Sequence, residues 1–167
     1  MLTPQHNDNT AVGYFALLAN TTGANNVAVG SSALDANTTA SNSTAIGTLS
    51  LTSQTTGHSN TAVGKEALRS NTTGTNNTSI GQIAGYGITT GVSNTIIGSR
   101  SGVTLAAGSY NTSLGVENFL TGTGSYNIAI GVQALRNLTT GSSNTAVGYR
   151  SAFNTSSGGS NTFVGDN

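Results

Sequence analysis

Short apolar segments recur along the chain at a nearly constant interval. Each segment ends in a glycine that follows a branched aliphatic residue, as in N-T-A-V-G at residues 60–64. Eight of the nine intervals between these marker glycines are 17 residues long, and one is 16. This regularity predicts ten copies of one small structural unit. The marker glycines are Gly13, Gly30, Gly47, Gly64, Gly81, Gly98, Gly115, Gly131, Gly148 and Gly165.

The residues before each marker glycine alternate as in a β-strand. The last one is Val, Ile or Leu, the residue two positions earlier is Thr, Val or Ile, and the residue between them is mostly Ala or Ser. Because side chains of a strand alternate between two faces, the two β-branched columns share one face. We expect that face to form the core. The predicted core residues are Val12, Val29, Ile46, Val63, Ile80, Ile97, Leu114, Ile130, Val147 and Val164.

A second apolar segment follows each marker glycine. It contains a small and a large residue, as in Ala33-Leu34 and Ala67-Leu68, and is followed by a Thr-Thr-Gly corner, as at residues 55–57. We expect two short strands and two corners in each unit. Helical repeats need about 33 residues and leucine-rich repeats at least about 20, so a period of 17 indicates a β-solenoid. The predicted fold is an all-β parallel β-solenoid, or β-roll, over residues 9–167, with residues 1–8 as a lead-in.

Asparagine occupies the position four before the marker glycine in nine of the ten units, and Ser43 replaces it in the other. If the units stack in register, these amides lie about 4.8 Å apart and form a hydrogen-bonded ladder. The alternative is that Asn merely suits a turn by bonding to its own backbone. The predicted ladder residues are Asn9, Asn26, Asn60, Asn77, Asn94, Asn111, Asn127, Asn144 and Asn161.

Charge is scarce, with five Lys or Arg and five Asp or Glu among 167 residues and no net charge. Nucleic-acid-binding proteins usually present a basic patch, so no nucleic acid partner is expected. No apolar run approaches the roughly 20 residues that span a bilayer, so no membrane insertion is expected. Met1 is followed by no signal segment, so we expect any export signal to lie outside this chain or to have been removed. The chain has no Cys, which excludes disulfides.

No constellation of catalytic or metal-binding residues emerges from the repeats. His6 and His58 are far apart and have no acidic or Cys partners at metal-ligand spacing. The many Ser and Thr residues have no positioned base that would make one of them a nucleophile. Most charged residues fall two or five positions after a marker glycine, and we expect those columns to be solvated. The sequence therefore predicts no catalytic, metal or cofactor site, and a protein that is not an enzyme.

The units at residues 25–30 (N-N-V-A-V-G) and 42–47 (N-S-T-A-I-G) resemble the head repeats of trimeric autotransporter adhesins. The longer pattern N-T-A-V-G-x-x-A-L…N-T-T-G is similar to repeat arrays of bacteriophage tail-fibre and bacterial surface proteins. The resemblance extends from Asn9 to Gly165. It implies a left-handed parallel β-roll, three chains side by side, and a place outside a cell, on its surface or on a virion. It also implies that the residues matching Val27 and Val29 face the core.

These observations favour a structural or adhesive role in an extracellular fibre: a surface adhesin, an appendage filament or a tail-fibre shaft. The expected partners are further copies of the chain, in a homotrimer or an end-to-end filament, because neither end of the array resembles a polar cap. A fragment of a longer array is the third possibility. A host-surface glycan or a matrix protein is a further expected contact. The alternative function is ice or polysaccharide binding by regular Thr columns, although we expect those columns to face the interior.

Overall fold

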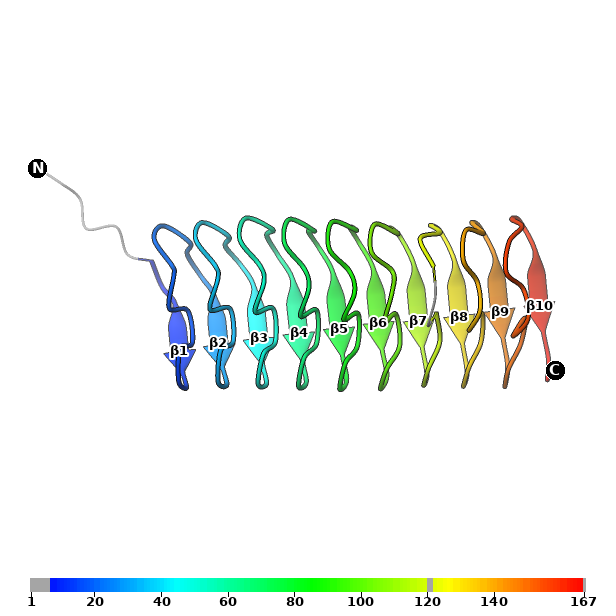
Figure 1. Ribbon diagram of the computed structural model, residues 1–167, viewed down its shortest axis with the longest axis horizontal. Helices are drawn as coiled ribbons and strands as arrows, with labels where there is room; N and C mark the ends of the chain where they lie inside the picture. The colour runs from blue at the N-terminus through cyan, green and yellow to red at the C-terminus, as the bar shows by residue number, and fades with distance from the viewer. Residues whose placement is uncertain (1–6, 120–121, 167) are drawn as a thin grey trace, which may run out of the picture.

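The structure is a rod of stacked rungs, shown in Figure 1. This computed structural model describes residues 7–119 and 122–166, so residues 1–6 of the predicted lead-in lie outside the described residues. The described residues contain no helix. Their ten strands are β1 (Thr10–Val12), β2 (Val27–Val29), β3 (Thr44–Ile46), β4 (Thr61–Val63), β5 (Thr78–Ile80), β6 (Thr95–Ile97), β7 (Thr112–Leu114), β8 (Ile128–Ile130), β9 (Thr145–Val147) and β10 (Thr162–Val164).

All ten strands form one parallel sheet in sequence order, so each strand pairs only with its neighbours in the chain. Equivalent residues of successive units pair with one another, as Ala28 with Ala45 and Ala45 with Ala62. The short interval between Gly115 and Gly131 leaves this register unchanged, since β7 and β8 still pair at equivalent positions. The predicted all-β parallel β-solenoid with a spacing of about 17 residues is therefore confirmed.

The facing of the strands is the reverse of the prediction. The middle residue of each strand, which is Ala or Ser in eight of the ten strands, points into the solenoid, and Ala28, Ala45 and Ala62 are fully buried. The third residue of each strand points outward, and Ile46 is 40% exposed. The core assignment was therefore wrong for the whole aliphatic column. That column is Val12, Val29, Ile46, Val63, Ile80, Ile97, Leu114, Ile130, Val147 and Val164, each of them exposed or half-buried.

The reversal has a steric cause in the narrow interior. The wall opposite the strands supplies the large side chains, such as Leu34, Leu51 and Leu68, all fully buried. Close packing leaves room for only a small residue facing them. Ile96, one of two large residues at the middle of a strand, supports this explanation, because the opposite wall there carries Gly102 in place of Leu. A Cβ atom on Gly102 would lie 3.2 Å from Cγ2 of Ile96.

The second segment of each unit faces the interior as predicted, but it is not a strand. Leu34, Leu51 and Leu68 have φ angles of 50–52°, in the left-handed region that no strand adopts. Backbone hydrogen bonds still join the rungs along this wall, for example from Leu34 N–H to the Ser50 carbonyl at 3.1 Å. A left-handed conformation costs an L-residue about 1–2 kcal/mol. Burying the leucine side chain offsets that cost with about 1.5–3 kcal/mol.

The marker glycines stack directly on one another at the end of the strands. Gly30 has a φ of 140°, and a Cβ atom built on it would lie 2.6 Å from the carbonyl carbon of Gly47. Both the backbone angle and the close approach of the next rung therefore require glycine. This column ends each strand and keeps the rungs at strand spacing.

Candidate functional site

The outward side of the sheet is an uncharged surface of aliphatic and Thr side chains, which we call the sheet face. It consists of the first and third residues of each strand, β1 to β10, and none of these twenty residues is charged. The third residue is always Val, Ile or Leu, and Ile80 and Leu114 are 40% and 48% exposed. Val116 and Val132, which follow the marker glycines after β7 and β8, are also exposed and extend the apolar part of the sheet face there. Contiguous exposed apolar surfaces on this scale are typical of interaction sites.

The first residue of each strand also points outward and is Thr in eight of the ten strands. Thr44 and Thr61 are half-buried, and Thr95 and Thr112 are exposed. The expectation that this column faces the interior was wrong, for the same steric reason as for the Val and Ile column. The sheet face is therefore a two-column array of Thr and aliphatic side chains at strand spacing.

Asparagine side chains form a buried ladder inside the rod, at the position directly before each strand. Asn94 Nδ2 donates to Asn77 Oδ1 at 3.0 Å and to the Gly108 carbonyl at 2.8 Å. Its Oδ1 accepts from the backbone N–H and from the Nδ2 of Asn111, at 3.0 and 3.1 Å. Amide-to-amide bonds of this kind continue from Asn60 to Asn161. The ladder fixes the register of the rungs and hence the regularity of the sheet face.

One residue that sequence reasoning missed links Ser43 to this ladder. Ser43 Oγ accepts the Asn60 backbone N–H at 3.3 Å but does not reach the Asn60 side-chain amide. Gln54 fills the gap, donating from Nε2 to Ser43 Oγ at 3.0 Å and accepting from Asn60 Nδ2 at Oε1 at 2.9 Å. The signal was present in the sequence, because equivalent positions in the neighbouring units are Asn37 and Asn71 and only this unit has Gln.

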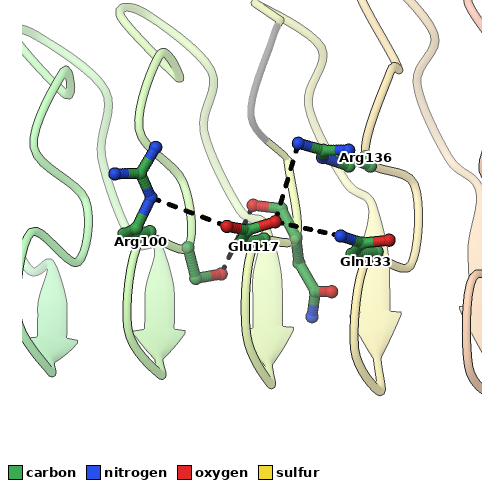
Figure 2. Close-up of polar contacts among 6 residues, drawn as sticks. Arg100, Glu117, Gln133 and Arg136 are labelled. Carbon is green, nitrogen blue, oxygen red and sulfur yellow. Dashed lines mark hydrogen bonds and ion pairs between the residues drawn. The ribbon is translucent and has the colours of Figure 1, made fainter.

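Most of the charged residues lie away from the sheet face, on the turns after the marker glycines. Figure 2 shows one cluster that spans three rungs. Glu117 accepts a hydrogen bond from Gln133 Nε2 at 3.0 Å and pairs with Arg100 and Arg136 at 3.7 and 3.6 Å. These side chains are partly exposed, and such ion pairs contribute about 0–1 kcal/mol each. The cluster joins neighbouring rungs but assembles no catalytic pair.

A pair of exposed aromatic rings lies at another corner of the rod. Tyr110 and Tyr126 stack with ring centroids 5.0 Å apart and ring planes 5° apart. Both have left-handed φ angles, of 59° and 60°, at a position where the other described units have Asn, Ser or, in the first unit, Asp8. Each such conformation costs about 1–2 kcal/mol for a bulky residue, whereas one aromatic pair contributes about 0.5–1.5 kcal/mol. Stacking alone therefore does not offset the strain of both tyrosines.

The structure brings no catalytic or metal-binding group together in the residues that it describes. His6 lies outside them, and His58 Nδ1 accepts the Ser41 backbone N–H at 3.0 Å. No cluster of three His, Cys, Asp or Glu side chains suited to a metal ion occurs within residues 7–119 and 122–166. An open hollow at β10 has Asp166 as its one titratable group. It is lined by Ser151, Ala152, Thr162, Phe163, Val164, Gly165 and Asp166.

No helix able to cross a membrane is found within the described part of the chain. Comparisons with models of protein families, with curated proteins and with solved structures gave no match for this chain.

Proposed function

We propose that this chain is a non-enzymatic structural and adhesive segment of an extracellular fibre, and that copies of it associate side by side through the sheet face. One observation carries the proposal. The sheet face presents Val, Ile or Leu on every rung without a charged residue, although charged side chains are available on the turns. An apolar stripe along the whole rod gains most when another copy covers it.

The sheet face is close to the size that such an association needs. Ten rungs at about 4.8 Å, and three residues across at about 3.3 Å each, give a surface of roughly 480 Å². Two copies that meet over this surface bury about 960 Å² in total, close to the roughly 1,000 Å² expected of a specific interface. A second copy also matches the rung spacing of the first, since both follow the same repeat.

A homotrimer is the arrangement that we propose, because the repeats resemble those of trimeric adhesin heads. Three rods with their sheet faces towards a common axis would cover all three stripes and leave the charged turns in water. The same resemblance supports a place outside the cell, on its surface or on a virion. This arrangement uses the sheet face, because the Ala and Ser column of the strands is buried inside each rod.

Sedimentation equilibrium tests the association directly. We expect the native chain to sediment at three times the 16.6 kDa mass of one chain. The triple variant Ile46→Lys, Ile80→Lys and Ile130→Lys should sediment as a monomer with an unchanged β-type circular dichroism spectrum. Its three side chains are 36–40% exposed, so lysine at these positions is compatible with the fold of the single rod but not with a covered face.

The matched control places three lysines on another exposed column. Thr73 and Thr140 are exposed at Thr-Thr-Gly corners, and Thr39 is exposed at the equivalent Thr-Thr-Ala corner, all three outside the strands. The variant Thr39→Lys, Thr73→Lys and Thr140→Lys should remain trimeric. A native chain that is monomeric at all concentrations, or a sheet-face variant with the native mass, contradicts the proposal.

Ice or crystalline polysaccharide binding is the second candidate, and the outward Thr column favours it. Thr and aliphatic side chains alternate on the sheet face at about 4.8 Å between rungs and about 6.7 Å along each strand. Such a flat, regular array matches a crystalline surface better than a soluble partner. Because this function needs the face that the trimer covers, a monomer that shapes growing ice crystals would support the second candidate. A trimer without effect on ice growth excludes it.

A further inference from the structure

We propose that Tyr110 and Tyr126 form a contact site for a neutral saccharide. Their rings are 50% and 60% exposed and stack in parallel on successive rungs. The pair lies on the corner that precedes β7 and β8, two residues before the first residue of each strand. This inference deepens the adhesive role proposed above by naming the chemistry of the partner, and it rests on that role for its biological meaning.

Backbone hydrogen bonds tie both tyrosines to the preceding rungs. The N–H of Tyr110 donates to the Val92 carbonyl at 2.9 Å, and the N–H of Tyr126 donates to the Ser109 carbonyl at 3.0 Å. The same column carries Ser93 on the rung before the pair and Ser143 on the rung after it. Because serine is small, the outer face of each ring borders a rung without a bulky neighbour in that column. Each tyrosine thus presents an aromatic face that one flat ring can cover.

A row of serine hydroxyls runs beside the rings. Ser125 Oγ accepts the Ser109 backbone N–H at 3.0 Å, and Ser142 Oγ accepts the Ser125 backbone N–H at 3.1 Å. A hydroxyl that accepts in this way keeps its own proton for donation. The row therefore offers fixed donors at rung spacing, within the same corner as the aromatic faces.

The chemistry of this corner favours an uncharged ligand with both apolar and hydroxyl groups. Residues 104–110, 122–126 and 139–143 contain no charged side chain. The negative face of an aromatic ring attracts the polarised C–H groups of a sugar ring, and tyrosine adds a hydroxyl at its tip. An anionic ligand would find no cation here, whereas a neutral pyranose would find ring faces and hydroxyl partners. Tyrosine at a position otherwise filled by the small polar residues Asn, Ser and Asp is consistent with selection for this contact.

Saturation-transfer NMR tests this site with maltohexaose, cellohexaose and N-acetylchitohexaose as neutral probes and a heparin hexasaccharide as the charged probe. We expect transfer from the native protein to the ring protons of at least one neutral probe. The double variant Tyr110→Ser and Tyr126→Ser should weaken that binding by roughly tenfold or more. Serine is native to this column on other rungs, so the substitution suits the local backbone.

Tyr149→Ser is the matched control, since Tyr149 is also exposed but follows a marker glycine next to the sheet face. It should leave saccharide binding unchanged. Shifts of the tyrosine ring resonances in the native chain provide a measurement that needs no variant. Absence of transfer to every neutral probe, tighter binding of heparin, or binding that persists in the double variant overturns the assignment. Sedimentation of the same samples tests the fibre proposal separately. A trimer that binds no saccharide contradicts the saccharide site and leaves the association through the sheet face intact.

Discussion

Neighbouring residues of one strand have opposite roles in this rod. Ala45 is fully buried, whereas the adjacent Ile46 is 40% exposed on the sheet face. Ala45→Asp places an unpaired carboxylate in the apolar interior, which costs several kcal/mol. We expect the melting temperature of this variant to be far below that of the native chain. Ile46→Asp should retain the fold and weaken self-association, and equal melting temperatures for the two variants would contradict the observed facing.

The ladder asparagines stabilise the rod, because replacing one of them leaves buried polar groups of its neighbours without hydrogen-bond partners. Asn94→Ala removes two donated and two accepted hydrogen bonds in a fully buried site. Each buried polar group left unsatisfied costs about 1–3 kcal/mol. We expect a loss of at least about 3 kcal/mol in chemical denaturation. Exposed Asn76, one rung earlier at the corner, is the control, and an equal loss for Asn76→Ala would argue against a structural ladder.

The turns depend on a steric requirement at the marker glycines. A Cβ atom on Gly64 would lie 2.5 Å from the Gly81 carbonyl oxygen, whereas one on Gly165 would have no atom within 4 Å. Both residues have φ angles near 130°, so the two substitutions share backbone strain and differ in the clash. We expect Gly64→Ala to lower the melting temperature far more than Gly165→Ala. Similar losses would show that strain, and not rung stacking, requires the glycine.

Sequence periodicity was sufficient for the units, the parallel strands and the Asn column, because each depends on a residue recurring every 17 positions. It could not determine which face of a strand is internal. Alternation shows only that Thr44 and Ile46 share a face and that Ala45 has the other. Hydrophobicity then favoured Ile46 as core, but the opposite wall already fills the interior with leucine. The tyrosine pair was also missed, since its meaning depends on two rings meeting in space.

At the scale of the whole molecule, the rod separates its surfaces by chemistry. The strands present an uncharged aliphatic and Thr face, most of the charged residues lie on the turns after the marker glycines, and a hydroxyl-rich corner carries the tyrosine pair. Each rung contacts mainly its neighbours, so the rod gains stability rung by rung as in other repeat proteins. A surface that is apolar over every rung suits lateral association along the full length of the rod.

Spin labels on single cysteines test the central proposal most directly, because the native chain has no cysteine to interfere. Ile80→Cys places a label at the middle of the sheet face, and Thr73→Cys places one at the Thr-Thr-Gly corner of the same unit. If copies associate through the sheet face, labels at position 80 should show strong dipolar coupling between chains, and labels at position 73 should show weak coupling. Absence of coupling at position 80, or stronger coupling at position 73, would contradict association through this face.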